Sequence, residues 1–260
     1  MRLINAEEIK FLIDDPLSPG FACLYELYDS IFTLPGEKES IDGFIKTSAF
    51  NKNEVLQNKY GPFAELWIKA VDVNQNIVGG VNFVVFCLPD ISCVSVHIIY
   101  IFTDAEVRGK GIATKLLLAA ESFAADWLRR RDVKYSDMYF FCEQNVPELM
   151  NEAEYIQDSM DSGIDPYERL MWWVKRGYRR LAIDYVQPPL SVNSEPCRTL
   201  SLNVRSDNDY IDASIVYSHL CRFFYITVLK NPRIRSGIAD QVLNNIKTRG
   251  KIELMRRNIY

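Results

Sequence analysis

The chain has 260 residues, of which 48% are hydrophobic and 25% charged, the balance of an ordinary globular protein with a sizeable core. Its net charge of −4 lacks the basic excess that nucleic-acid-binding proteins carry, so no nucleic-acid partner is expected. Six cysteines without a CxxC pair, and only two histidines, give no pattern of a metal site or of a disulfide framework.

Apolar periodicity predicts the first elements of the chain. Residues 21–32 place their apolar side chains on one helical face, and a second short helix is expected near residues 38–45. Residues 63–73 and 77–86 are two apolar segments rich in β-branched and aromatic types, and the turn-forming residues 74–76 separate them. This pattern predicts a β-hairpin.

The stretch from residue 94 to residue 128 combines a strand, a glycine turn and a helix. Residues 94–103 have the composition of a buried strand, and residues 112–128 form an apolar stripe at helical spacing. Between them, the two glycines of the turn permit tight backbone geometry. The unpaired N–H groups at a helix start carry partial positive charge, to which Arg108 and Lys110 add. The turn is therefore expected to bind an anion such as a phosphate.

Arg108, Gly111 and Ala113 form the pattern RxxGxA directly after a strand. It is neither the GxxxxGK(S/T) of a Walker loop nor the GxGxxG of a dinucleotide site. In this context it resembles the (Q/R)xxGx(G/A) motif of the GCN5-related N-acetyltransferases, the GNAT superfamily, whose loop holds the pyrophosphate of acetyl-CoA. The resemblance covers about residues 20–205 and is motif-specific only over residues 95–118.

The resemblance implies an α/β (α+β) fold and one cosubstrate, acetyl-CoA. The fold would have a mixed, mostly antiparallel central sheet flanked by helices, with its fourth and fifth strands splayed apart. Residues 138–142 are predicted to be the fifth strand. In the family, the acyl-pantetheine arm lies in the wedge between these two strands, where exposed backbone amides can pair with it.

Two features after the fifth strand depart from the family pattern. Residues 146–167 insert a strongly acidic segment, which could recruit a cationic acceptor or be a solvated loop or a partly mobile lid. Trp173 stands where many relatives have a tyrosine that protonates the leaving thiolate, and an indole N–H is not a usable acid. Tyr178 or Tyr185 could take that role, or each could be structural.

The family core would end near residue 205, so we expect an acetyltransferase domain over residues 1–205 and a helical C-terminal extension over residues 206–260. The extension is expected to pack on the core and to shape the acceptor side, or to build a dimer interface. The remaining pattern predicts strands over 179–186 and 197–204, helices over 207–228 and 236–249, and a short strand over 251–255.

Three tasks follow from the resemblance: binding the pyrophosphate, polarising the thioester carbonyl and taking a proton from the acceptor. The second falls to a backbone N–H at the end of the fourth strand, acting as an oxyanion hole. Asn145, after the fifth strand, is assigned to the cofactor site as well. The other residues assigned to the cofactor are Ile101, Phe102, Thr103, Arg108, Gly109, Lys110, Gly111, Ile112, Ala113 and Thr114.

Three side chains are the catalytic candidates. His97 lies on the central strand, where the histone-acetylating branch of the family places a glutamate, and its ordinary pKa of about 6.5 suits a general base. It could equally be a core histidine bonded to a neighbouring strand. Glu143 is the rival base, and Tyr185 is the candidate acid. Many relatives use only a chain of water molecules.

The sequence thus predicts an acyl-CoA-dependent N-acetyltransferase that transfers acetyl from acetyl-CoA to a primary amine of a small molecule or peptide, by direct attack in a ternary complex. The alternative is a catalytically silent acetyl-CoA-binding or interaction module, which Trp173 and the extension suggest. A longer acyl donor and a homodimer are open alternatives. Without a signal-peptide core or an apolar run of spanning length, a cytoplasmic location away from membranes is expected.

Overall fold

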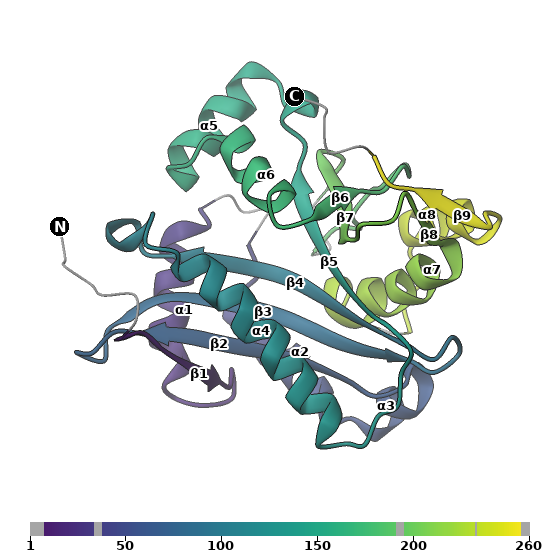
Figure 1. Cartoon of the computed structure of the whole chain (residues 1–260), viewed down its shortest axis with the longest axis horizontal. Helices are drawn as coiled ribbons and strands as arrows, with labels where there is room; N and C mark the ends of the chain where they lie inside the picture. Colours follow the sequence, from purple (N-terminus) through teal and green to yellow (C-terminus); the bar gives the residue numbers. More distant parts are fainter. Residues whose placement is uncertain (1–7, 34–37, 191–194, 232, 256–260) are drawn as a thin grey trace.

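One mixed sheet organises the protein (Figure 1). The computed structural model describes residues 8–33, 38–190, 195–231 and 233–255. The sheet has seven strands in the order β1-β2-β3-β4-β5-β7-β6, and every neighbouring pair is antiparallel except β4 and β5. The strands are β1 (Lys10–Asp14), β2 (Phe63–Val71), β3 (Ile77–Leu88), β4 (Cys93–Thr103), β5 (Met138–Asn145), β6 (Tyr178–Arg180) and β7 (Leu200–Arg205). The predicted mixed, mostly antiparallel sheet is confirmed.

Helices cover both faces of this sheet. In Figure 1, α4 crosses one face, whereas α1 and α2 lie behind the other. A short hairpin of β8 (Tyr210–Asp212) and β9 (Lys251–Glu253) forms a second sheet. The helices are α1 (Phe21–Ile31), α2 (Ile41–Phe50), α3 (Glu54–Tyr60), α4 (Ile112–Arg129), α5 (Glu152–Ser162), α6 (Pro166–Val174), α7 (Ala213–Arg222) and α8 (Gly237–Lys247), and a π-helical segment, Phe223–Val228, continues α7. No helix in the described part of the chain is long and apolar enough to cross a membrane.

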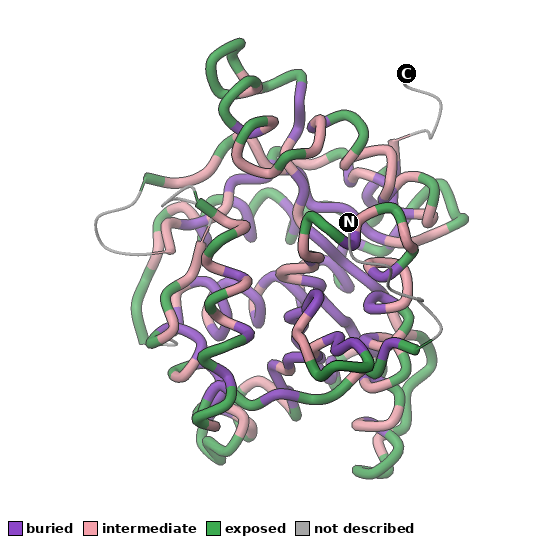
Figure 2. Tube along the Cα trace, turned by 90° about the vertical axis from the view of Figure 1, so that its left-hand side faces the viewer, coloured by how far each residue is buried: buried purple, intermediate pink, exposed green. Residues whose placement is uncertain are grey.

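Strand β3 lies at the centre and is buried on both faces. Because side chains alternate along a strand, Val81, Phe83 and Val85 pack in the core under α4, whereas Val84 and Phe86 pack in the core under α7. Figure 2 shows the buried segments running through the middle of the molecule. This two-sided burial explains why residues 77–88 are an almost continuous apolar run rather than an alternating one.

The sheet opens between β4 and β5. Parallel pairing of these strands ends at Ile98 and Cys142, although both strands continue beyond these residues. The register of β4 against β3 also shifts here, which leaves Ile99 as an extra, bulged residue. A bulge bends its strand, so the β5-facing backbone of residues 99–103 lies outside the ladder and borders a wedge. The predicted splaying of the fourth and fifth strands is confirmed.

The C-terminal segment packs directly on the sheet. Val216 and Leu220 of α7 are fully buried in one cluster with Val84 and Phe86 of β3. Arg222 fastens the same helix, since its Nε donates to the carbonyl of Tyr60 at 2.6 Å and its Nη2 lies 3.1 Å from Asp90. The division of the chain at residue 205 stays a prediction.

Several elements differ from those expected. Strand β1 and helix α3 were not predicted, and the acidic segment 146–167 is not a loop, because it holds α5 and the start of α6. The strand predicted over 179–186 is only the short β6, since the amide of Ala182 bonds to Glu253 next to the hairpin instead of continuing in the main sheet. The helix predicted from residue 207 starts at Ala213, because residues 210–212 pair with β9.

Candidate functional site

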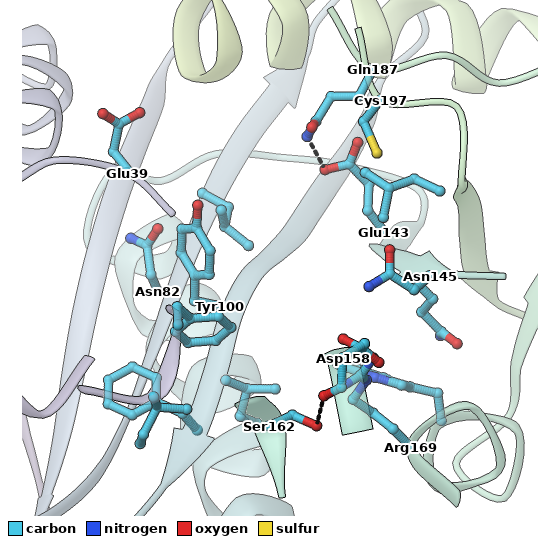
Figure 3. A pocket seen from close by; sticks show the side chains of 18 of the residues that line it. Glu39, Asn82, Tyr100, Glu143, Asn145, Asp158, Ser162, Arg169, Gln187 and Cys197 are labelled. Atoms are coloured by element: carbon cyan, nitrogen blue, oxygen red, sulfur yellow. Dashed lines mark hydrogen bonds and ion pairs between the residues drawn. The ribbon is translucent and has the colours of Figure 1, made fainter. Parts of the chain in front are cut away.

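A cavity of about 470 Å³ lies in the wedge between β4 and β5. It extends from the N-terminus of α4, past the C-terminal end of α5 and along α6, to α2, β2 and the π-helical segment after α7. Figure 3 shows its two sides, with Glu143, Asn145 and Gln187 on one and Glu39, Asn82 and Tyr100 on the other.

The turn before α4 has the geometry of an anion site. Gly109 and Gly111 have φ of 76° and 77°, in the left-handed region that glycine adopts at no steric cost. A Cβ on either glycine would meet no atom within 4 Å, so the turn faces open space. Gly111 is the N-cap and no side chain caps it, which leaves the N–H groups of residues 112–114 to a ligand.

Several residues predicted for the cofactor lie along the cavity. Ile112 does not, because it is 1% exposed and packs in the core beneath α4. Gly109, Lys110, Gly111 and Thr114 lie at the turn itself, beside the cavity end. The residues of this set that line the cavity are Ile101, Phe102, Thr103, Arg108, Ala113 and Asn145.

Two arginines reach this turn from different elements. Arg108 lines the cavity, and its Nη1 donates to the carbonyl of Gly163 at the end of α5, at 3.3 Å. Arg176 lies over the ring of Trp172, with its guanidinium carbon 3.7 Å from the ring centroid, and it donates to the hydroxyl of Thr114. Arg176 was missed in the sequence, where nothing distinguishes it from other basic residues near a helix end.

Glu143 is the acidic group of the wedge. Its Oε1 accepts a short hydrogen bond from the Tyr185 hydroxyl and its Oε2 accepts from Gln187 Nε2 at 2.8 Å, while the side chain is 12% exposed. Burial raises the pKa of Glu143 to about 7, against the opposing effect of these two hydrogen bonds. A carboxyl group on the cavity wall therefore changes its protonation near neutral pH.

Residues 21–138 match the sequence model of the acetyltransferase (GNAT) family. The chain carries a GNAT-family domain. Its fold is similar to that of a GNAT-family protein from Bacteroides thetaiotaomicron, with a TM-score of 0.51 at 13% identity over 84% of this chain and 99% of that one.

Two other solved structures match with lower TM-scores. A GNAT acetyltransferase from Staphylococcus aureus Mu50 has 15% identity and a TM-score of 0.40, and the match covers 76% of this chain and 98% of the other. Naa50 from Arabidopsis thaliana, solved with a bisubstrate analogue, has 12% identity and a TM-score of 0.43 over 76% and 99%. No curated protein matches the sequence.

His97 lies behind the wall of the cavity rather than on it. The side chain is fully buried, its Nδ1 is 3.0 Å from Nε2 of His219, and its ring stacks on Phe223 with centroids 3.8 Å apart. Burial lowers the pKa of His97 to about 3, so the imidazole is neutral at physiological pH. Its Nε2 lies 3.9 Å from Glu143 Oε2. These features favour the interpretation as a core histidine over that as a general base.

The candidate acids do not present a hydroxyl to the cavity. Tyr185 is 5% exposed and its hydroxyl donates to Glu143, so it orients that carboxylate. Trp173 lines the cavity and packs edge-on against Tyr178, with ring centroids 4.8 Å apart. The Tyr178 hydroxyl is buried and has no hydrogen-bond partner within the described ranges. At the Trp173 position the ring therefore supplies packing and not a proton.

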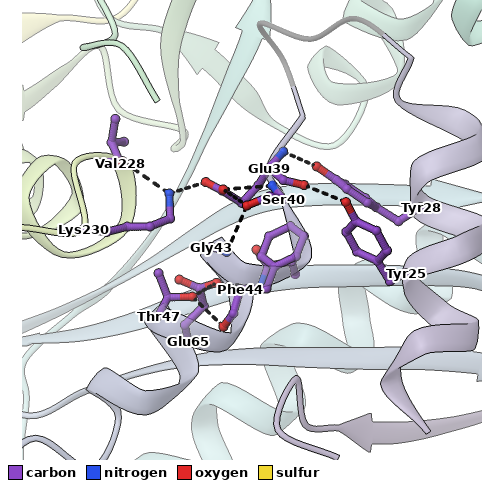
Figure 4. A network of polar contacts seen from close by, with 11 residues as sticks. Tyr25, Tyr28, Glu39, Ser40, Gly43, Phe44, Thr47, Glu65, Val228 and Lys230 are labelled. Atoms are coloured by element: carbon purple, nitrogen blue, oxygen red, sulfur yellow. Dashed lines mark hydrogen bonds and ion pairs between the residues drawn. The ribbon is translucent and has the colours of Figure 1, made fainter. Parts of the chain in front are cut away.

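The end of the cavity away from α4 holds a polar network that the sequence did not indicate (Figure 4). Lys230, which follows the π-helical segment, forms an ion pair with Glu39 and donates to the Val228 carbonyl at 3.3 Å. The amide of Glu39 donates to the Tyr28 hydroxyl at 2.7 Å. Because residues 39 and 230 are 191 positions apart, only the folded chain brings them together.

Beside this network lies a second acidic group, Glu65 on β2. Its Oε1 accepts from the Thr47 hydroxyl at 2.9 Å and from Asn82 Nδ2 at 3.3 Å. Burial raises the pKa of Glu65 to about 7. Among the described residues, no cluster of three or more histidine, cysteine or acidic side chains could hold a metal ion.

Proposed function

We propose that the protein is an acetyl-CoA-dependent N-acetyltransferase that acetylates a primary amine by direct attack in a ternary complex. One observation carries the proposal: Glu143, whose pKa is about 7, lines the same cavity that begins at the anion-binding turn of a GNAT-family domain. A base that is ionised near neutral pH, close to an acyl donor, is what proton removal from an amine requires.

The residues at the α4 end fit the cosubstrate. The pyrophosphate would be held by the backbone N–H groups of residues 109–114, with Arg108 and Arg176 adding positive charge. The β5-facing backbone of residues 99–103 and the side chain of Asn145 border the wedge, where the pantetheine arm would pair. The space beside both glycines is open, so it has room for the pyrophosphate, and a side chain at either position would take up that room.

Acetyl-CoA supplies the acetyl group as a thioester. Glu143 Oε2 takes the proton from the attacking amine, while the Tyr185 hydroxyl holds the carboxylate in place through Oε1. A backbone N–H within residues 101–103 donates to the carbonyl oxygen as negative charge develops there. The C–N bond forms as the C–S bond breaks, and the thiolate that leaves, with an ordinary thiol pKa of about 8.5, takes its proton from water.

A thermal-shift titration with CoA and acetyl-CoA tests the binding step. At 100 times its Kd a ligand stabilises the folded state by about 2.7 kcal/mol, which for a chain of this size corresponds to a shift of about 5–10 °C. Gly111→Glu places a carboxylate in the turn and should abolish the shift. Gly111→Asn is the matched control, because asparagine tolerates positive φ and carries no charge. A wild-type protein that gives no shift with either ligand contradicts the proposal.

Turnover separates the enzyme from the silent module. Free thiol is measured with acetyl-CoA and a panel of primary amines, for the wild type and for Glu143→Gln. The enzyme releases CoA only when an amine is present, and the substitution should lower kcat/KM by about 10²- to 10⁴-fold, the usual contribution of a general base. Binding of CoA without thiol release for any amine would instead support the module.

A further inference from the structure

The cavity end away from α4 contains buried hydrogen-bond acceptors that the protein leaves unused. Oε2 of Glu65 and Oδ1 of Asn82 have no hydrogen-bond partner in the described chain, and the side chains are 5% and 0% exposed. Oγ1 of Thr227, in the π-helical segment, is also unpartnered and 7% exposed. All three residues line the cavity. Buried polar atoms without partners are rare in proteins, so we expect a ligand to form hydrogen bonds with these three side chains.

The hydrogen-bond network fixes which atoms are left over. Asn82 donates through Nδ2 to Glu65 Oε1 at 3.3 Å and to the carbonyl of Leu66 at 3.2 Å. A flipped amide would set its oxygen against these two acceptors, so the orientation with Oδ1 unpartnered is the favoured one. Thr47 occupies Oε1 of Glu65 as well. The remaining atoms of Glu65 and Asn82 are therefore both acceptors, and they require a donor.

The charge of Glu65 is not neutralised by a direct partner. Lys230 is the basic side chain whose charge acts on Glu65, but its ammonium group is paired with Glu39 and bonded to the Val228 carbonyl. Lys230 is held there with φ of 47°, a conformation that non-glycine residues rarely adopt. The fold thus keeps this lysine on Glu39 and leaves Glu65 to another cation. π-Helical segments, such as the one that carries Thr227, are frequent at functional sites.

We propose that this end of the cavity binds a second protonated amine of the acceptor, separate from the nitrogen that is acetylated, so that the substrate is a compound with at least two amino groups. An ammonium group has three N–H donors and one positive charge, which match the acceptors of Glu65, Asn82 and Thr227. The Glu65 carboxylate would repel an acceptor that carries a carboxylate or phosphate at this end. The proposal rests on the acetyltransferase function proposed above.

The test compares diamines with monoamines of equal length. The kcat/KM of α,ω-diaminoalkanes of three to six carbons is measured beside that of the n-alkylamines of the same carbon number, with saturating acetyl-CoA. A charged hydrogen-bonded contact predicts that the preferred diamine exceeds its monoamine by about 10- to 100-fold, mainly through KM. Glu65→Gln should reduce this ratio to within about threefold of unity.

Asp161→Asn is the matched control, because Asp161 is another carboxylate on the same cavity, in the last turn of α5 just before Gly163, whose carbonyl accepts from Arg108. It should leave the ratio of diamine to monoamine as in the wild type. Equal kcat/KM for diamines and monoamines in the wild type, or a Glu65→Gln variant that keeps the ratio, overturns the inference. Those outcomes still show CoA release, so they leave the acetyltransferase function intact. Failure of that function appears separately, as no thiol release with any amine.

Discussion

The hydrogen bond from Tyr185 to Glu143 sets the pH at which the proposed base works. Tyr185→Phe removes the hydroxyl that donates to Oε1 and leaves Gln187 on Oε2. Hydrogen bonds to charged groups contribute about 1.5–3 kcal/mol, and one pKa unit corresponds to about 1.36 kcal/mol. The loss therefore raises the pKa of Glu143 from about 7 by about one to two units. Because the base must be ionised, activity then requires a higher pH.

The assay is the pH profile of kcat/KM, which reports the ionisation of the free enzyme and the free substrate. In the wild type the rising limb of kcat/KM should lie near pH 7, and in Tyr185→Phe it should lie at about pH 8–9. The same amine is used throughout, because the titration of its amino group at about pH 10 is then common to both profiles. The substitution should mainly shift the pH of the rising limb, and the plateau value of kcat/KM should change little.

Tyr178→Phe serves as the control for removing a buried phenol hydroxyl. That hydroxyl is also buried, at 1% residue exposure, but it has no partner among the described residues. Its removal should leave the limb in place. The reasoning is refuted if Tyr185→Phe keeps the wild-type limb, or if the two variants move it equally. An unmoved limb together with full activity of Glu143→Gln would point to a water chain as the base.

Three further variants test the fold and the site. Leu220→Ala empties a fully buried position of α7 and should lower the free energy of unfolding by about 2–5 kcal/mol in urea titrations. The pKa of Glu65 is raised to about 7, so its contribution to the free energy of unfolding is complete below about pH 4.5 and is lost as the pH rises through 7. Glu65→Gln should therefore flatten the pH dependence of the free energy of unfolding. Between pH 5 and pH 8 the difference from the wild type is expected to be at most about 3 kcal/mol. Arg176→Ala should raise the Kd for CoA by about 10- to 100-fold, whereas Arg129→Ala at the other end of α4 should not.

The strand, turn and helix around the motif could be predicted because their signals are local. Apolar periodicity marks β4 and α4, and the positive φ of Gly109 and Gly111 follows from the need for a tight turn. Strand β1 was missed because it is a largely exposed edge strand, whose only buried residue is Asp14. Such a strand shows little alternation, and its place is set by pairing with β2.

The acidic segment contains two local signals of a helix start. Asn151 and Glu154 form a capping box at the start of α5, and Asp165 caps α6 with Pro166 at its first position. These four residues mark two helix starts, but the high density of carboxylates favoured a loop in the sequence interpretation. Asp158 is in fact buried and paired with Arg169 at 2.5 Å, a contact between helices that no local pattern reveals.

The proposed acceptor end of the cavity depends on contacts between distant parts of the chain. Glu65 meets Thr47 and Asn82 through strand pairing and helix packing, and these polar residues lie in segments whose sequence otherwise indicates core. A buried glutamate in the strand FAELWIKAV has no sequence feature that separates it from an exposed one. What marks Glu65 is its buried Oε2, which has no hydrogen-bond partner among the described residues, and only the folded structure shows this.

The C-terminal region joins core packing to the proposed acceptor recognition. Helix α7 is held on the sheet by His219, whose Nδ1 lies 2.9 Å from the Ser95 hydroxyl, and by the buried Leu220. The same helix continues into the π-helical segment that brings Thr227 and Lys230 to the cavity. Because the side chains that fix the helix and those that line the cavity lie on one continuous segment, truncation before α7 would remove Thr227 and Lys230 from the cavity and would also expose the core of β3. The proposed acceptor recognition therefore depends on the folding of the C-terminal region.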